Sequence, residues 1–385
     1  ADLAEELGLT TIDIAHLGTA YLVSYMFGQF SSSYFGRRLG PKLLLLVGMG
    51  ISLLCNVAFG ISNGFWTVLL FLCINGLAQG TGWPGCIGSL AFWFKRKQRG
   101  SILGIWATCY QIGSVLASSF AAFLLGAAGW RWSFFGASAV LLVVWFVVLL
   151  LHPNRPRDVK LPALEDDEED DVEQTDDGKP RGLGWTRGVV ITILLMGLTY
   201  FCIKFLRYAL WSWTPFFLRR NFDLAGDEAG YLSTVFDICG FLGVLAAGFL
   251  SDKLFKGRRA FIALLMMAMM TVSFAIMYLW GSSGVFYFTV SMGLAGFMLY
   301  GPDSLISGVG AIDVGSKRGA LVAAGIINGM GSIGPVFQEQ LIGWMYDAFD
   351  QQLLPIFFVF VGVALVGTMV TVALWLRSRL GRSRL

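Results

Sequence analysis

Apolar segments of about 20 or more residues recur along this 385-residue chain, and they constrain its fold more than any other feature. A helix of that length crosses the hydrocarbon core of a bilayer. Hydrophobic residues make up 56% of the chain and charged residues only 14%. Because this composition is too apolar for a soluble globular domain, the sequence predicts an all-α membrane protein that crosses the bilayer many times.

The segments long enough to cross a membrane as helices number eleven. They cover residues 12–35, 43–61, 66–94, 101–125, 132–151, 189–217, 230–250, 260–280, 284–314, 319–346 and 354–376. All six cysteines fall inside these segments. We therefore expect neither a disulfide framework nor a metal site.

Basic residues mark one side of the membrane. Of the 28 Lys and Arg residues, 23 lie in the loop after the first segment, in every second loop after it, and in the C-terminal tail. The other loops hold only Arg131, Arg219 and Arg220. Because cytoplasmic loops carry an excess of Lys and Arg, the rich loops are predicted to be cytoplasmic.

The chain also repeats itself. The basic loop at residues 37–42 matches residues 252–259 at an offset of 215, and residues 97–100 match 316–319 at an offset of 219. Two halves at this spacing are typical of transporters built from duplicated six-helix bundles, with the substrate site at their interface near the bilayer midplane.

The repeat predicts a first bundle at residues 1–151, a linker at 152–188 and a second bundle at 189–385. Counting back by the same offset places the counterpart of the first helix of the second bundle before residue 1, so we expect the first bundle to lack its first helix. The alternative is a protein of eleven spans with its N-terminus outside. The linker carries an acidic run at 165–171, which is expected to be solvated and cytoplasmic.

Two cations fall in the middle of the segment 189–217. A charge at the centre of a bilayer costs roughly 3 to 15 kcal/mol, so Lys204 and Arg207 should face a polar interior. At a spacing of three residues they share one helix face with Trp211 and would form a platform for an anion. They could simply neutralise buried acids, but we favour a functional role because charges inside membranes commonly mark substrate pathways.

Two aspartates, Asp237 and Asp303, also lie inside predicted spans, where each is costly unless it is paired. Lys204 and Arg207 are the nearest counter-ions in type. The pairs could be fixed and structural, or they could break and re-form as substrate charge enters. Both interpretations stay open for Asp237, whereas Asp303 follows a helix-breaking Gly-Pro pair and is expected to be structural.

Neutral hydrogen-bonding side chains recur in the first half. Tyr25 and Gln29 lie one turn apart, Gln79 and Trp83 repeat that spacing in another span, and Tyr110 lies midway along a third. Each alone could be satisfied by a hydrogen bond between helices. If these side chains pointed toward one cavity, they could bind the uncharged part of an oxygen-rich substrate. No nucleophile motif, zinc spacing or phosphate-binding glycine loop is present in the sequence, so we expect neither an enzyme nor a cofactor.

Several short motifs carry a family resemblance. They are GTGWP at 80–84 followed by Arg99-Gly100, LRY at 206–208 with WTP at 213–215, STVFD at 233–237 leading to Ser251-Asp252, YGP at 300–302, and GMGSIG at 329–334. Over nearly its whole length the chain resembles the major facilitator superfamily and, within it, the organophosphate:phosphate antiporters. The resemblance implies two six-helix bundles that exchange a phosphorylated small metabolite for inorganic phosphate by alternating access.

The resemblance also implies roles for single residues. Arg207 falls where the bacterial glycerol-3-phosphate carrier keeps a phosphate-binding arginine, and Lys204 falls where sugar-phosphate exchangers keep a lysine. Tyr25, Trp83 and Asp237 fall on positions similar to functional ones in that carrier. A guanidinium offers a planar fork of donors to phosphate oxygens and an ammonium adds a point charge, which suits this role.

Departures from the family pattern bear on the substrate and on gating. Gln29 stands where the glycerol-3-phosphate carrier has a lysine and Tyr110 where it has a histidine, so that carrier's substrate is not carried over. The first-half cytoplasmic loop reads Arg37-Arg38 in place of an acidic and then a basic residue. The usual gating ion pair of that half is therefore not expected, and Asp252 is the candidate in the second half.

The sequence thus predicts a secondary transporter that exchanges a sugar phosphate or glycerol phosphate for inorganic phosphate. Lys204 and Arg207 are expected to bind the phosphate group. One alternative is a proton-coupled organic-anion symporter of the same superfamily, and another is a transport-inactive sensor of sugar phosphate. We expect a monomer surrounded by lipid, with no nucleic-acid partner. The expected location is a bacterial inner membrane or, alternatively, a eukaryotic endomembrane.

Overall fold

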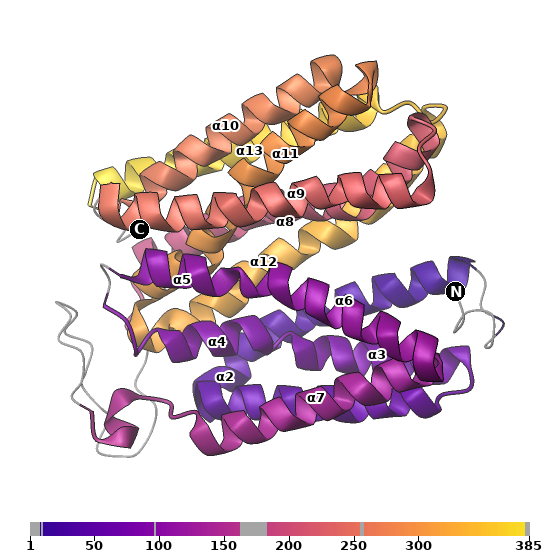
Figure 1. Cartoon of the computed structure of the whole chain (residues 1–385). Helices are drawn as coiled ribbons and strands as arrows, with labels where there is room; N and C mark the ends of the chain where they lie inside the picture. Colours follow the sequence, from indigo (N-terminus) through magenta and orange to yellow (C-terminus); the bar gives the residue numbers. More distant parts are fainter. Residues whose placement is uncertain (1–7, 9–10, 96–97, 162–182, 255–257, 382–385) are drawn as a thin grey trace. The chain divides into compact units, whose positions relative to one another are not determined.

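The computed structural model describes residues 8, 11–95, 98–161, 183–254 and 258–381, and the regular structure in these ranges is helical (Figure 1). The α-helices are α2 (Thr11–Ile61), α3 (Phe65–Gln79), α4 (Gly82–Leu90), α5 (Arg99–Ala107), α6 (Cys109–Ala128), α7 (Trp130–Leu151), α8 (Arg187–Asn221), α9 (Gly226–Phe249), α10 (Arg259–Trp280), α11 (Val285–Ser304), α12 (Ala311–Ala348) and α13 (Leu354–Arg379). Shorter 3-10 or π-helical stretches cover Pro156–Val159, Leu250–Leu254, Gly281–Ser283 and Leu305–Gly310. The all-α prediction is confirmed.

Nine helical stretches within the described ranges are long and apolar enough to cross a membrane. Two of them exceed a single crossing, since His16–Ile61 has 46 residues and Val285–Ala348 has 64. The backbone leaves helical geometry inside each, at Gly40 (φ 76°) and at Ser316 (φ 67°). Each break falls between two predicted spans. The number of crossings stays a prediction.

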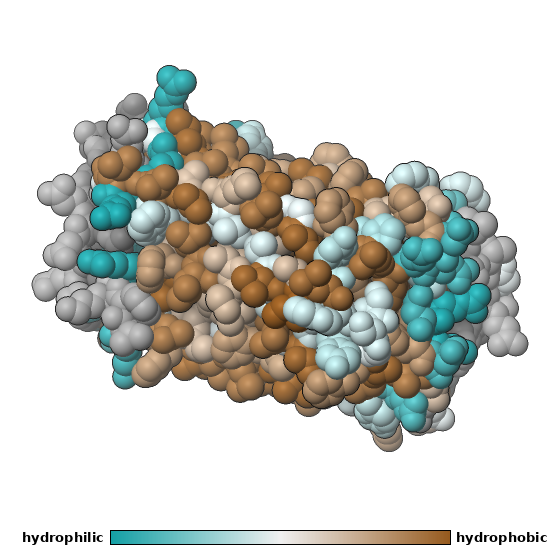
Figure 2. All heavy atoms as spheres, turned by 90° about the horizontal axis from the view of Figure 1, so that it is seen from above, coloured by the Kyte–Doolittle hydropathy of each residue, from teal (hydrophilic) through white to brown (hydrophobic). Residues whose placement is uncertain are grey.

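The outer faces of the helices are apolar. Leu116, Phe123, Leu150, Phe286 and Phe358 are each more than 60% exposed. Figure 2 shows a face that is largely hydrophobic, with hydrophilic residues gathered toward its two ends. Large exposed apolar surfaces are rare on soluble monomers, so these faces are suited to the acyl chains of a bilayer.

The chain divides into two compact units. Unit 1 comprises Ala1–Phe94, Cys109–Leu183 and Ser316–Gly329, and unit 2 comprises Lys95–Thr108, Gly184–Gly315 and Met330–Leu385. In unit 1, α2 packs against α3, α4 and α7, and α6 packs against α7. In unit 2, α9 packs against α11, α10 packs against α11 and α13, and α8 packs against α9 and α13.

Small residues allow close helix packing within each unit. A Cβ atom on Gly28 of α2 would collide with the backbone of Leu77 in α3, and one on Gly243 of α9 would collide with the backbone of Phe297 in α11. Membrane helices gain little from hydrophobic burial against each other, so such close backbone contact supplies much of their association. Aromatic side chains then fill the interior of unit 2, where Phe205 and Phe288 are fully buried.

Candidate substrate site

The charged face of α8 lies within unit 2. The side chain of Thr186 caps α8 by accepting a hydrogen bond from the amide of Val189, and the helix then continues for 35 residues. Lys204, Arg207 and Trp211 recur at intervals of three and four residues, so they share one side of the helix, as predicted from the spacing.

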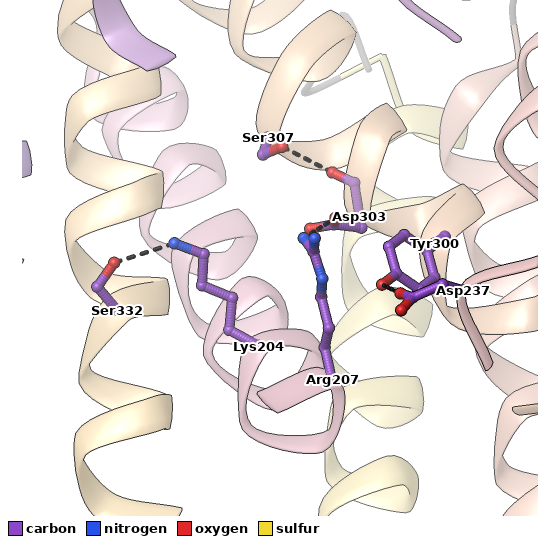
Figure 3. Close-up of polar contacts among 7 residues, drawn as sticks. All are labelled: Lys204, Arg207, Asp237, Tyr300, Asp303, Ser307 and Ser332. Atoms are coloured by element: carbon purple, nitrogen blue, oxygen red, sulfur yellow. Dashed lines mark hydrogen bonds and ion pairs between the residues drawn. The ribbon is translucent and has the colours of Figure 1, made fainter. Parts of the chain in front are cut away.

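Arg207 forms an ion pair with Asp303 of α11. Its Nη1 donates to Oδ2 of Asp303 over 2.8 Å, and its guanidinium lies over the ring of Tyr300 at 4.6 Å from the centroid (Figure 3). The Arg207 side chain is 17% exposed and that of Asp303 is 9% exposed. Oδ1 of Asp303 is buried and accepts no hydrogen bond from the described residues. The ion pair is therefore largely shielded from solvent, but part of the Arg207 side chain remains accessible.

Lys204 points to another helix. Its Nζ donates to Oγ of Ser332 in α12 over 3.0 Å (Figure 3). The same atom lies 5.1 Å from the centre of the Tyr200 ring. The side chain is only 4% exposed. The two cations of one helix face thus contact different helices, Arg207 on the α11 side and Lys204 on the α12 side.

Asp237 joins the cluster through a tyrosine. The Tyr300 hydroxyl donates to Oδ1 of Asp237 over 2.7 Å, so this α9 carboxylate is connected to the guanidinium of Arg207 by one aromatic ring (Figure 3). Trp211 lies further along α8, where it is 59% exposed and its ring is 6.2 Å from that of Tyr208. Both aspartates named from the sequence therefore belong to one polar cluster with Arg207.

The remaining predicted contacts lie in unit 1. Trp83 and Tyr110 stack with ring centroids 5.4 Å apart, and Tyr25 stacks on Tyr21 at 6.1 Å. Tyr110 is 43% exposed, whereas Trp83 is 7% exposed. Gln29 is fully buried, and neither polar atom of its amide has a partner among the described residues. The predicted first-half residues are thus two stacked aromatic pairs and a buried amide, and their contact with a substrate stays a prediction.

The gating candidate Asp252 lies in the π-helical stretch Leu250–Leu254, but its side chain is outside the described part of the structure. Sequence reasoning missed a different buried acid, Asp313. It accepts from Nη1 of Arg99 over 3.0 Å and from Nε of Arg259, and all three side chains are 1% exposed. The signal was available, because Asp313 lies inside the predicted span 284–314.

A second missed acid is Glu339 of α12. Its Oε2 accepts from the side chains of Gln338 at 2.7 Å and of Ser212 and Trp213, both at 3.3 Å. It too falls inside a predicted span, 319–346, and the criterion applied to the two aspartates would have found it. Among the described residues, no three His, Cys, Asp or Glu side chains are grouped so that they could hold a metal ion.

A sequence profile described as Major Facilitator Superfamily matches residues 1–337. The chain belongs to the major facilitator superfamily. It resembles the sugar phosphate exchanger 3 of Gallus gallus, with 29% identity over 87% of this chain and 75% of the relative. The probable hexose phosphate transport protein of Chlamydia pneumoniae is 27% identical over 90% of this chain and 79% of its own length. The glycerol-3-phosphate transporter of Bacillus subtilis is 26% identical over 90% and 80%.

Solved structures of other proteins share the fold. The transporter FucP in an outward conformation superimposes with a TM-score of 0.72 at 16% identity, covering all of this chain and 93% of the other. A bacterial homologue of ferroportin in an outward-facing state gives 0.71 at 14% identity over 97% and 93%. The family match and the relatives confirm the predicted resemblance and show an integral membrane transporter rather than an enzyme.

Proposed function

We propose that this superfamily member exchanges a phosphorylated small metabolite for inorganic phosphate by alternating access, with Lys204 and Arg207 holding the phosphate. The names of the sugar phosphate and glycerol-3-phosphate relatives support a phosphorylated substrate. The observation that carries the proposal is a pair of cations on one face of a membrane helix, one of which keeps 17% of its side chain exposed. Buried charge of this kind is expensive and marks a solute pathway.

The two cations would divide the work. The planar guanidinium of Arg207 can present two parallel donors to phosphate oxygens, whereas the Lys204 ammonium acts as a point charge. In the present structure the carboxylate of Asp303 occupies one edge of the guanidinium. An arriving phosphate would weaken that contact, so the Arg207–Asp303 pair is a gating element as well as a structural one.

The neutral residues would contact the rest of the substrate. As the family resemblance and, for Trp211, the spacing on α8 imply, we assign this role to Tyr25, Gln29, Trp83, Tyr110 and Trp211. Asp237 accepts a hydrogen bond from the Tyr300 hydroxyl, and the Tyr300 ring contacts Arg207. A movement of Arg207 would therefore be transmitted to Asp237 through Tyr300. A low-dielectric pocket with few polar groups discriminates substrates by the donors and acceptors it leaves unpaired.

The proposal is tested by phosphate counterflow in liposomes that contain the purified protein. Vesicles preloaded with unlabelled phosphate should accumulate labelled phosphate, and externally added sugar phosphates or glycerol 3-phosphate should compete. Arg207→Gln should abolish this uptake. Arg219→Gln provides the matched control, because Arg219 lies on the same helix and is exposed at its end.

Two results would favour other functions. Uptake of a carboxylate driven by a proton gradient, without phosphate exchange, would indicate an organic-anion symporter. Saturable binding of a sugar phosphate without any phosphate flux would indicate a sensor. Neither result is expected if both cations hold the transported phosphate.

A further inference from the structure

The carboxylate of Glu339, which is half-buried, differs from the buried acids of unit 2 in its partners. Its Oε2 accepts hydrogen bonds from the Gln338 amide, the Trp213 indole and the Ser212 hydroxyl. The Ser212 hydroxyl also lies within hydrogen-bonding distance of the backbone carbonyl of Tyr208. All of these donors are neutral. Among the described residues no cation pairs with Glu339, so its charge is not neutralised in the way that Arg207 neutralises Asp303.

This cluster retains unused acceptors. No described hydrogen bond reaches Oε1 of Glu339, since all three contacts end on Oε2. The Gln338 side chain is 1% exposed, and its Oε1 is buried without a partner among the described residues. The buried amide oxygen of Gln338 is therefore a costly unpaired acceptor, whereas Oε1 of the half-buried Glu339 is open to an incoming donor. The cluster can therefore accept a ligand that brings hydroxyl or N–H donors.

The mixture of groups narrows the ligand class. A hydroxyl donates one hydrogen bond and accepts others, so it matches a site that holds both N–H donors and free carboxylate or amide oxygens. A metal ion would be repelled by the indole and amide N–H groups, and an anion would be repelled by the carboxylate. The neutral polyhydroxyl part of a larger ligand satisfies both restrictions.

The cluster is held in place by aromatic packing. The Trp213 indole stacks on Phe217 with ring centroids 5.8 Å apart and meets Phe216 edge-on at 5.6 Å. An indole fixed on two sides presents its N–H in a constant direction, which orients the Glu339 carboxylate. Preorganised polar groups bind with less loss of conformational entropy than mobile ones.

The position of Glu339 relates the cluster to the phosphate site. Ser332, which contacts Lys204, and Glu339 are seven residues apart on α12, so they share a face and are separated by about 10 Å along the axis. The matching residues of α8 are Lys204 and Ser212. A phosphate ester held at Lys204 can therefore direct its carbon chain along the α8–α12 seam toward Glu339. A hexose chain reaches further along it than glycerol does.

We infer that Glu339, with Trp213 and Gln338, forms a hydroxyl-binding subsite for the carbon part of a phosphorylated sugar. The inference rests on the proposed phosphate site and assigns the substrate preference to a second point on the same seam. A site built around substrate hydroxyls discriminates strongly against analogues that lack them.

The test is calorimetric titration of the full-length chain in lipid nanodiscs with glucose 6-phosphate, glycerol 3-phosphate and inorganic phosphate. Glu339→Leu removes both acceptors and should raise the Kd of glucose 6-phosphate about 10- to 100-fold. Glu339→Gln keeps one neutral acceptor and should have a smaller effect. The Kd of inorganic phosphate should stay unchanged, which also shows that the variants are folded. Gln340→Leu, at the next and exposed position of α12, is the control.

Deoxy analogues of glucose 6-phosphate sharpen the result. For the analogue that lacks the hydroxyl bound by Glu339, Glu339→Leu should cause no further loss of affinity. Equal weakening of phosphate and ester, an unchanged ester Kd, or a pH-dependent effect common to both ligands would overturn the subsite. If wild-type protein bound neither phosphate nor ester, the proposed function itself would fail. Normal phosphate binding with an ester Kd that ignores Glu339 would remove the subsite alone.

Discussion

Removal of the Asp303 charge should tighten the binding of anions. In the structure, Nη1 of Arg207 donates to Asp303 over 2.8 Å. A phosphate on the opposite edge of the guanidinium would lie about 6 Å from that carboxylate, and two like unit charges at this separation repel by about 3 kcal/mol at an effective dielectric of 20. Asp303→Asn keeps the shape of the side chain and removes this repulsion. We expect the Kd of inorganic phosphate to fall by up to about 100-fold.

The same calorimetric titration measures this change. Sugar phosphate and inorganic phosphate should gain alike, because Asp303 acts on the shared phosphate group. Turnover should fall at the same time, since a more tightly held anion leaves more slowly. Asp347→Asn serves as the control, because Asp347 is exposed at the end of α12. A phosphate Kd that is unchanged or weaker in Asp303→Asn would show that the carboxylate orients Arg207 rather than opposing the substrate.

Further predictions concern three other positions. Arg207→Lys should reduce phosphate counterflow severely although the charge is kept, because the fork of donors is lost, whereas Arg219→Lys should not. Asp313→Asn leaves the buried guanidinium groups of Arg99 and Arg259 without its charge and should destabilise the protein by about 3 to 5 kcal/mol, read as a lower thermal unfolding midpoint than that of Asp347→Asn. Burial lowers the pKa of His152 below 6.5. The free energy of unfolding should therefore stay constant above pH 6.5 and decrease as the pH falls toward the lowered pKa. His152→Gln should remove this decrease in thermal unfolding scans at acidic pH.

The sequence predicted the architecture because hydrocarbon leaves few alternatives. A segment that is apolar over a bilayer's thickness becomes a helix, and the nine long apolar helices of the described ranges follow this rule. Where two predicted spans are joined by a short loop, as around Gly40 and Ser316, the structure has one helical stretch with a single non-helical residue. Hydropathy cannot distinguish a short loop from a helix interrupted at one residue, since both arrangements bury the same apolar surface.

The polar cluster around Arg207 was predicted in its residue types and less well in its contacts. Spacing on α8 correctly placed Lys204, Arg207 and Trp211 on one face, because that depends only on the helical repeat. The choice between Asp237 and Asp303 as the partner of Arg207 depends on how α9 and α11 are rotated, which no single segment reveals. In the packed structure Arg207 pairs with Asp303, and Asp237 accepts a hydrogen bond from the Tyr300 hydroxyl.

The contacts of α8 divide the proposed work between two neighbouring helices. Toward α12 they keep one register over two turns, because Lys204 meets Ser332 and Ser212 meets Glu339. A ligand that bridges these points would be carried by α8 and α12 together. Toward α11 the contact is one ion pair, Arg207 with Asp303, whose strength depends on the charge that arrives. Changes at Glu339 should therefore alter the choice among phosphate esters, whereas changes at Asp303 should alter the affinity for all of them together with inorganic phosphate.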